Sequence, residues 1–401
     1  MDTIPDYELI ASQVKKVFAV EDFTLGTAQQ SFVVRFRGRL VAQDSAQAYD
    51  QLAENLKPLS LTPLFRVEKG QHIILIEKAL PTPKPGKTAL NWIMLGLTII
   101  SVITSGGLSN IETMPANFFQ AALLVLKEGW PFAVGLMSIL LAHELGHYLV
   151  ARAYGYSVSL PYFIPLPFTQ LGTMGAVIFS KERYKNRRIT FDMAAAGPLA
   201  GLVASIVVLV IGLSLSNLDR IPSVVSQGHL FQIEGNSIFY LFIKYLRFGK
   251  LLPQPLDYNG VAPWLYWLKY FFTGKPYPMG GLDVMIHPVA WAGWVGLLIT
   301  SLNLLPAGQL DGGHIFSMLF GVDRAKKIWP FIIVILAGLG FLWSGWWLWA
   351  GIIFFLGRLY AQPLDEITPL DRPRKLLGIL ILIILLLIFT PIPLVLISPA
   401  A

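Results

Sequence analysis

The sequence predicts a polytopic α-helical membrane protein with about seven transmembrane helices (six or eight are the alternatives) and a small N-terminal α+β soluble domain. Of its 401 residues, 54% are hydrophobic and 14% are charged, whereas a typical soluble domain has about 25% charged residues. A membrane-spanning helix needs about 17 to 25 mostly apolar residues. The apolar runs that suggest such helices are residues 89–108, 131–153, 190–216, 287–306, 328–343, 345–360 and 376–398. The fifth and sixth runs are close together, so we expect short or tilted spans there.

The first 80 residues predict the soluble domain. Asp44 followed by Gln47 resembles a helix N-cap with its partner, and predicts a helix that continues to about Leu56. The strand-like runs are residues 32–36, 61–67 and 72–76, with a turn at Gly70. Apolar residues at helical spacing near the start of the chain are Leu9, Ile10, Val14, Val17 and Phe18. The Pro-rich residues 81–88 then predict a linker, and residues 89–398 form the membrane domain.

Basic residues predict the orientation of the chain. The net charge is +7, and Lys and Arg favour the cytoplasmic flanks of membrane spans. With seven spans, the basic clusters at residues 78–87, 181–188, 324–327 and 372–375 all lie on one side. We therefore expect a cytoplasmic N-terminal domain. Basic residues beside the membrane spans account for the positive charge. The expected partner is therefore the lipid bilayer and not nucleic acid.

The long segment 217–286 is expected on the side of the membrane opposite the N-terminal domain. It contains two stretches rich in Tyr, Trp, Phe and Leu, residues 238–249 and 262–273. Such stretches are typical of helices that lie along the membrane interface rather than span it.

The second apolar run, residues 131–153, contains the polar sequence His143-Glu-Leu-Gly-His147. Two His side chains four residues apart project from the same face of a helix and can bind one zinc ion. Glu144 lies beside the first His and can act as the general base on a metal-bound water. Ionisable residues inside a span indicate a functional site by default. A polar cluster that packs helices together is the alternative.

Asp311 is the candidate third zinc ligand. The chain has no cysteine, so any metal site must use His, Asp or Glu. A catalytic zinc site has three protein ligands and leaves one position for water. Asp311 follows Asn303-Leu-Leu-Pro306, where proline breaks the helix. This break places Asp311 at a depth compatible with the two His residues. A helix cap at the interface is the alternative role.

The sequence resembles the site-2 protease family of intramembrane metalloproteases over roughly residues 89–360. The resemblance rests on His143–His147 and on Asn303-Leu-Leu-Pro-Ala-Gly-Gln-Leu-Asp311-Gly-Gly. The runs Leu171–Gly175, Ala194–Gly201 and His287–Gly293 are most similar to the cyanobacterial and plastid EGY-type branch. No PDZ-like insertion is evident, which departs from the PDZ-bearing bacterial branch.

The resemblance implies Zn2+ held by His143, His147 and Asp311, with Glu144 as the base, in a catalytic core at about residues 131–321. It implies hydrolysis of a peptide bond in a transmembrane helix of a protein substrate, as in regulated intramembrane proteolysis. It also implies a multi-pass protein of a bacterial membrane, either a cyanobacterial plasma or thylakoid membrane, with its active site towards the cytoplasm. A partner of the N-terminal domain is not indicated by any motif.

Several further residues are candidates for binding or positioning. The Asn303 amide is a candidate donor to the substrate carbonyl or its oxyanion, and helix–helix contact is its alternative role. Residues 161–179 suggest an extended hairpin whose edge, with Gly172 and Gly175, binds an unwound substrate; an ordinary re-entrant loop is the alternative. His314 is either a neighbour of the metal ligands or an interfacial residue. Gly197 and Gly201 form a Gly-x-x-x-Gly pattern, which indicates close helix contact.

Two other functions are compatible with a membrane protein of this kind. A catalytically inactive relative would act as a membrane scaffold or chaperone, although every residue of the motif is present. An ion-coupled transporter would need polar residues in several spans, and the third, fifth, sixth and seventh runs contain few.

Overall fold

The computed structural model describes residues 7–27, 29–79, 88–111, 113–180, 182–223, 231–258 and 260–397. The chain forms two compact units, which are described separately. The first unit contains residues 1–86, 180–192 and 361–376, and the second contains the rest. The predicted linker falls almost entirely outside the described residues.

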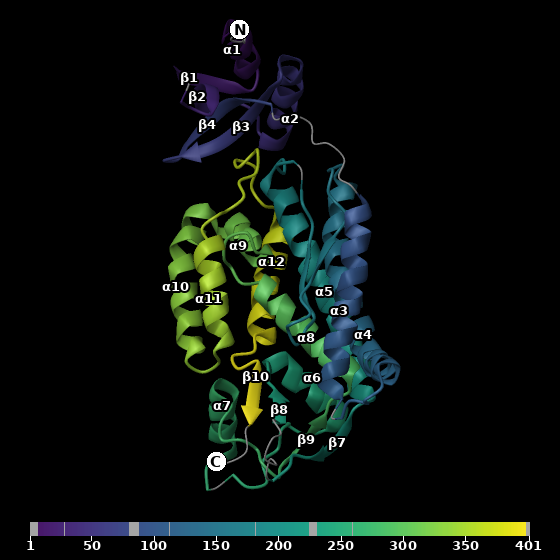
Figure 1. Cartoon of the computed structure of the whole chain (residues 1–401). Coiled ribbons are helices and arrows are strands. Elements are labelled where there is room, and N and C mark those ends of the chain that lie inside the picture. Colours follow the sequence, from purple (N-terminus) through teal and green to yellow (C-terminus); the bar gives the residue numbers. More distant parts are fainter. Residues whose placement is uncertain are drawn as a thin grey trace. The chain divides into compact units, whose positions relative to one another are not determined.

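The first unit is built around a four-stranded antiparallel sheet with the strand order β1-β2-β4-β3. Two helices accompany the sheet (Figure 1), and the core between them includes Phe18, Phe36, Leu52 and Phe65, all fully buried. In chain order the elements are α1 (Tyr7–Lys15), β1 (Phe18–Leu25), β2 (Phe32–Leu40), α2 (Ser45–Leu56), a 3-10 turn (Lys57–Leu59), β3 (Leu61–Glu68) and β4 (Gln71–Lys78). The predicted α+β character of this region is confirmed.

Local sequence signals located most of these elements. The Asp44 carboxylate accepts a hydrogen bond from the amide of Ala46 at 3.0 Å, so the N-cap of α2 is confirmed. The helical assignment of Val17 and Phe18 is wrong, because α1 ends at Lys15 and Phe18 begins β1. Both residues are apolar and buried, and a short buried run fits a helix or a strand equally well by spacing alone.

Two segments far along the chain extend this sheet. Residues 364–366 lie beside β3, where the Phe65 amide donates to the Leu364 carbonyl at 2.9 Å. On its other side the same segment pairs with residues 184–186, and the Leu364 amide donates to the Tyr184 carbonyl at 2.9 Å. Both pairings are parallel. The first unit therefore includes two segments that the sequence analysis assigned to the membrane domain.

Asp365 holds the inserted segment in place. Its side chain is completely buried and accepts hydrogen bonds from the Ser45 hydroxyl at 3.1 Å and the Ile367 amide at 2.9 Å. The amide and the hydroxyl of Thr368 also donate to it. A buried carboxylate with this many donors fixes the chain around it, because each donor would otherwise lose its partner.

Asp365→Ala is expected to destabilise the first unit by about 3 kcal/mol, since it leaves several buried donors without an acceptor. Pulse proteolysis of the full chain in increasing urea measures this change. Asp22→Ala is the control, because Asp22 is exposed and its ion pair with Arg37 spans 3.7 Å; its loss should change stability by less than about 1 kcal/mol. Equal effects of the two substitutions would contradict the role given to Asp365.

The second unit is mostly helical. Among the described residues, three helices are long and apolar enough to cross a membrane: α3, α4 and α5. α4 packs against both α3 and α8 and lies among them in Figure 1. The helices are α3 (Thr88–Asn110), α4 (Phe118–Ala153), α5 (Arg187–Ser214), α8 (Pro288–Asn303), α9 (Asp311–Phe320), α10 (Val322–Gly340), α11 (Gly345–Leu356) and α12 (Arg372–Ile388).

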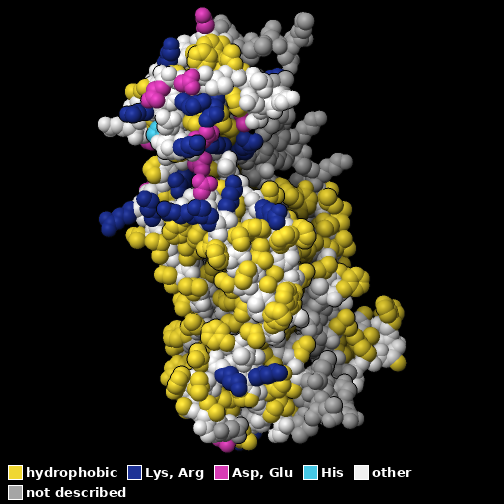
Figure 2. All heavy atoms as spheres, turned by 90° about the vertical axis from the view of Figure 1, so that its left-hand side faces the viewer, with side chains coloured by type: hydrophobic (Ala, Val, Ile, Leu, Met, Phe, Trp, Pro, Cys, Tyr) yellow, Lys and Arg dark blue, Asp and Glu magenta, His cyan; other side chains and the backbone are white. Residues whose placement is uncertain are grey.

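The helix bounds differ most from the predicted apolar runs at the start of α4 and at the end of α12. α4 begins at Phe118, well before the predicted start at 131, and Asn117 caps it by accepting from the amide of Phe119 at 2.9 Å. The run 376–398 is a single predicted span, but α12 ends at Ile388, and strand β10 (Leu394–Ile397) follows. Figure 2 shows hydrophobic side chains over much of the helical surface. Exposed examples are Val134 on α4, Val203 on α5 and Phe331 on α10.

The segment between α5 and α8 contains short strands and two helices. Strand β7 (Asn217–Arg220) pairs with β9 (Leu282–Met285), and β8 (Phe231–Glu234) pairs with β10. The helices α6 (Ile238–Phe248) and α7 (Pro263–Thr273) fall within the two predicted aromatic stretches. On α6 the exposed apolar residues Ile238, Phe242 and Leu246 recur every four residues, which gives this helix one continuous apolar face.

Candidate metal and catalytic site

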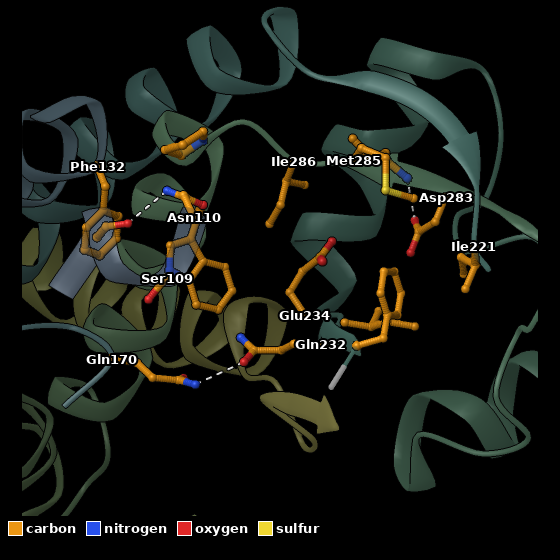
Figure 3. Close-up of a pocket in the computed structure, with 16 residues that line it drawn as sticks. Ser109, Asn110, Phe132, Gln170, Ile221, Gln232, Glu234, Asp283, Met285 and Ile286 are labelled. Atoms are coloured by element: carbon orange, nitrogen blue, oxygen red, sulfur yellow. Dashed lines mark hydrogen bonds between the residues drawn. The ribbon is translucent and has the colours of Figure 1, made fainter. Parts of the chain in front are cut away.

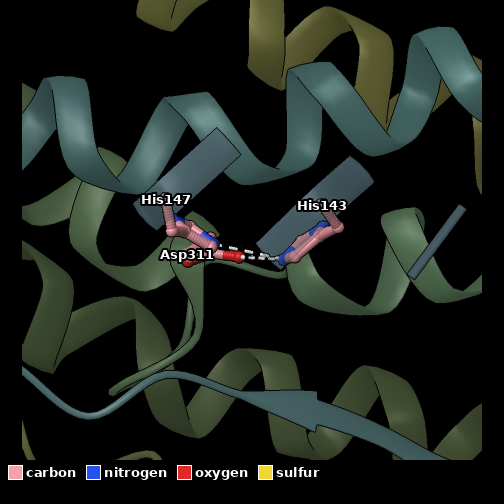
Figure 4. Close-up of side chains that lie close together, drawn as sticks. All are labelled: His143, His147 and Asp311. Atoms are coloured by element: carbon pink, nitrogen blue, oxygen red, sulfur yellow. Dashed lines mark hydrogen bonds and ion pairs between the residues drawn. The ribbon is translucent and has the colours of Figure 1, made fainter. Parts of the chain in front are cut away.

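The three predicted metal ligands lie together in the second unit. The Nε2 atoms of His143 and His147 are 3.2 Å apart. Asp311 completes the group: its Oδ2 lies 3.4 Å from Nε2 of His143 and its Oδ1 lies 3.5 Å from Nε2 of His147. Figure 4 shows the two rings and the carboxylate converging on one point. Among the described residues, this is the group of His, Asp and Glu side chains arranged to hold a metal ion.

Local structure explains this convergence. His143 and His147 stand one turn apart on α4 and share a face. Asp311 is the first residue of α9, after the chain leaves α8 at Asn303. Gly312 allows the return, because a Cβ there would lie 1.9 Å from the carbonyl oxygen of Leu304. The break predicted around Pro306 is thus a tight reversal that turns Asp311 back towards α4.

The spacing of these atoms fits zinc. A tetrahedral zinc ion with bonds of about 2.0–2.2 Å requires ligand atoms about 3.3–3.5 Å apart. The two Nε2 atoms are 3.2 Å apart, close to that requirement, and each lies 3.4–3.5 Å from a different oxygen of Asp311. Two imidazoles and one carboxylate are also the ligand types of catalytic zinc sites with one open position. The residues present therefore fit a zinc ion in ligand type and in approximate spacing.

Helix α5 holds the second His in its orientation. Nδ1 of His147 lies 2.7 Å from the carbonyl oxygen of Met193, so the ring donates this proton and presents Nε2 to the metal position. The close approach depends on glycine: a Cβ at Gly197 would lie 2.1 Å from Nε2 of His147, and one at Gly201 would lie 3.2 Å from Nδ1 of His143. The Gly-x-x-x-Gly pattern therefore makes room for the metal ligands. The role of the Met193 carbonyl could not be predicted from the sequence, because every residue has a backbone carbonyl and this role selects no residue type.

Gly197→Ala is expected to reduce zinc affinity by about 100-fold or more. Removing a residue that only hydrogen-bonds to a metal ligand lowers metal affinity about 10–100-fold, and displacing His147 itself should lower it further. Gly201→Ala should have a smaller effect, since its contact of 3.2 Å needs only a small shift. Zinc content after dialysis against a metal buffer measures both. Gly338→Ala on α10 is the control, because a Cβ there meets nothing within 4 Å. Normal zinc affinity in Gly197→Ala would contradict the arrangement.

The other predicted residues, Glu144, Asn303 and His314, lie close to the metal ligands in the sequence, and their burial and their places on the helices differ. Glu144 follows His143 on α4 and is 5% exposed. Asn303 is the last residue of α8, at the start of the reversal that leads to Asp311. His314 lies one turn after Asp311 on α9, and its buried Nδ1 has no hydrogen-bond partner in the described part of the chain.

The predicted hairpin is confirmed within residues 161–179. Strand β5 (Tyr162–Pro165) pairs with β6 (Thr173–Val177), and β5 contacts α3. Gly172 has a φ of +70°, and a Cβ there would lie 2.7 Å from the Ser101 carbonyl, so this glycine fits the hairpin to α3. Gly175 has a φ of +102° and open space around it. Of the two glycines, Gly175 is therefore the one with room for a ligand beside it.

The comparisons with known proteins place the chain in a family. Residues 131–343, more than half of the chain, match Peptidase family M50. The chain is 31% identical over 393 residues to "Probable zinc metalloprotease EGY2, chloroplastic" of Arabidopsis thaliana, covering 94% of this chain and 64% of the relative. It is 29% identical over 340 residues to "Probable zinc metalloprotease EGY1, chloroplastic" of Oryza sativa subsp. japonica, covering 78% and 52%.

The matched part of these relatives is shorter than their full length, since the chain spans less than two thirds of each. The family match nevertheless includes α4 with His143 and His147 as well as Asp311. The ligand geometry and the family match agree, and this chain belongs to peptidase family M50.

Proposed function

We propose that this protein is an intramembrane zinc metalloprotease of the site-2 type. It would hydrolyse peptide bonds within or near transmembrane helices of substrate proteins. The observation that carries the proposal is the group His143, His147 and Asp311. Its two His residues and Glu144 lie on α4, a helix apolar enough to cross a membrane. The printed names of the EGY relatives, which call them probable zinc metalloproteases, support the same activity.

The residues around the metal position have distinct tasks in this proposal. Zinc, when bound, supplies Lewis acidity that lowers the pKa of a coordinated water from about 15.7 towards 7. Glu144 accepts the proton from the attacking water and delivers it to the leaving amine. The Asn303 amide donates to the carbonyl oxygen as negative charge develops on it. The Met193 carbonyl keeps His147 in the tautomer that leaves Nε2 free.

The substrate backbone is proposed to bind along β6. A transmembrane helix must unwind before it is cut, and its freed amides and carbonyls then need partners. β5 occupies one edge of β6, and the Met174 side chain on β6 is 67% exposed. An unwound segment added to the other edge of β6 would satisfy its backbone groups, with Gly175 giving it close access. β6 also contacts α4, the helix that carries His143.

The membrane topology belongs to the same proposal. We place seven spans in residues 89–398, with the soluble domain of residues 1–80 and the active site facing the cytoplasm, as the basic clusters indicate. α8, α10, α11 and α12 would then cross as short or tilted helices. The similarity to chloroplast proteins fits a plasma or thylakoid membrane of a bacterium of the cyanobacterial branch.

Removing zinc tests the proposal. Purified protein is expected to contain one zinc per chain and to cleave a reporter transmembrane helix reconstituted with it. A chelator should abolish cleavage, and added zinc should restore it, because without metal no hydroxide forms at neutral pH. Bound zinc without cleavage of any reporter would favour the inactive scaffold. Absence of bound zinc in the purified protein would overturn the proposal.

A further inference from the structure

A polar cavity lies in the second unit, away from the metal ligands. It measures about 360 Å³ and lies between the end of α3, the turn of the β5–β6 hairpin, and strands β8 and β9. Phe132 of α4 lines it, eleven residues before His143, which corresponds to about 16 Å along a helix. Figure 3 shows Glu234 pointing into the cavity and Asp283 at its side. The proposed catalytic steps use none of these groups.

Buried charge is unbalanced around this cavity. Glu234 and Asp283 both line it and are 5% and 3% exposed. The one cation beside them in the described structure is Lys244, whose fully buried Nζ lies 3.7 Å from Glu234 and 3.9 Å from Asp283. Burial raises the pKa of Glu234 to about 7 and also raises the pKa of Asp283. Two buried carboxylates that share one ammonium group would be stabilised by a second cation.

Lys244 does not fully satisfy its carboxylate neighbours. Both ion-pair distances exceed hydrogen-bond length, and Nζ has no hydrogen-bond partner among the described residues. Its remaining neighbour is the ring of Tyr240, whose centroid lies 4.5 Å away. Oε1 of Glu234 accepts from the Tyr240 hydroxyl at 2.8 Å. Oδ1 of Asp283 accepts from the Val284 amide at 2.8 Å. Both carboxylates line the cavity, and an ionised carboxylate can accept more hydrogen bonds than these.

The cavity is connected to the hairpin proposed to bind substrate. Gln170, in the turn between β5 and β6, donates a hydrogen bond to the Gln232 side chain on β8 at 3.0 Å, and both residues line the cavity. The Ser105 hydroxyl of α3 holds the same turn by donating to the Thr169 carbonyl at 2.7 Å. A substrate segment bound along β6 would therefore pass the cavity where it reaches the β5–β6 turn.

We propose that this cavity is a specificity subsite that takes a Lys or Arg side chain of the substrate, several residues from the bond that is cut. The inference rests on the proposed proteolytic function and names a substrate class within it. Glu234 and Asp283 would pair with the cationic group, and the Gln170 and Gln232 side chains would accept its remaining hydrogen bonds. The distance of about 16 Å along α4 from His143 to Phe132 at the cavity corresponds to about five residues of an extended substrate, so the basic residue would lie about five positions from the cut.

The chemistry of the lining favours a long basic side chain over other occupants. An apolar side chain would leave the carboxylates and amides of the cavity without partners. An acidic side chain would add a third negative charge next to two buried ones. The aromatic rings of Phe132, Phe231 and Trp291 line the same cavity and suit the aliphatic stem of Lys or the plane of Arg.

A substrate scan on the wild-type enzyme tests the subsite. Reporter helices carry Lys, Gln or Glu at each position three to eight residues from the cut, on both flanks. At one position Lys should raise kcat/KM over Gln by about tenfold, the effect of one charged hydrogen-bonded pair, and Glu should lower it. If no reporter is cleaved in a Glu144-dependent way, the proteolytic function fails. If cleavage occurs but kcat/KM is the same for Lys, Gln and Glu at every position, only the subsite proposal is overturned.

Two variants assign the preference to the cavity. Glu234→Gln should reduce the ratio of Lys to Gln reporters to about one, since Lys244 then balances the one remaining carboxylate, that of Asp283. Asp219→Asn is the matched control: Asp219 lies opposite Asp283 in the β7–β9 pair but does not line the cavity, and the ratio should persist. A persistent ratio in Glu234→Gln would overturn the assignment.

Disulfide trapping gives a readout that does not depend on the activity of Glu234→Gln. The chain has no cysteine, so a single Cys at Gln232 reports only on this cavity. With Glu144→Gln to prevent cleavage, a reporter with Cys beside its Lys should crosslink to Gln232→Cys and not to Asp219→Cys. Equal crosslinking at both positions would overturn the subsite.

Discussion

Replacing Glu144 with Gln is expected to stop hydrolysis of a reporter transmembrane helix while zinc remains bound. Gln keeps the size of the side chain but cannot take a proton from the attacking water, and a positioned general base contributes about 10²–10⁴-fold to rate. Metal binding should persist, because the proposed ligand atoms belong to His143, His147 and Asp311. Cleavage rate and zinc content, measured on the same preparation, separate the two effects.

Glu128→Gln is the matched control for this experiment. It makes the same chemical change on the same helix, at a partly exposed position whose ion pair with Lys127 spans 3.9 Å. Cleavage should be unchanged, since exposed pairs of this kind contribute about 1 kcal/mol or less. Full activity in Glu144→Gln would exclude Glu144 as the base and would require another proton acceptor near the metal position.

Replacing Asp311 with Ala is expected to remove zinc as well as activity. The substitution deletes one of the three proposed protein ligands, and losing even a residue that only hydrogen-bonds to a ligand costs about 10–100-fold in affinity. Zinc should therefore dissociate at concentrations that saturate the wild type. Competition with a chromogenic chelator measures this affinity directly. Activity should be absent at zinc concentrations that saturate the wild type and should return only at higher zinc.

Asp323→Ala provides the comparison for Asp311→Ala. Asp323 lies in the first turn of α10, just as Asp311 lies in the first turn of α9. Both carboxylates therefore interact with a helix N-terminus, but only Asp311 is near the two His residues. If Asp311 serves merely as a helix-terminal acid, the two substitutions should act alike on zinc and activity. A selective loss of zinc in Asp311→Ala supports its assignment as a ligand.

The sequence predicted the metal group because its determinants are local. Four-residue spacing on a helix is enough to align His143 and His147, and Pro306 marks the break that precedes Asp311. The supporting contacts were not predictable in this way. Met193 contributes a backbone carbonyl, and the pairing of Phe65 with Leu364 joins segments separated by most of the chain. Such contacts follow from tertiary packing and leave no periodic pattern.

The polar cavity shows the same limit. Glu234, Lys244 and Asp283 lie in a segment whose charges look scattered when it is viewed as one long loop between spans. Their meeting depends on β8, α6 and β9, and two of these are strands of only four residues. Strands this short are held by pairing with β10 and β7, so their partners cannot be inferred from local propensity.

The two segments inserted beside β3 have a consequence for the order in which the protein assembles during synthesis. The sheet of the first unit begins with residues that leave the ribosome first, but its outer positions are filled by residues 184–186 and 364–366. Its buried anchor, Asp365, is therefore made only after α3, α4, α5 and α8–α11. The N-terminal domain, although translated first, can reach its final form only when nearly the whole chain has been synthesised.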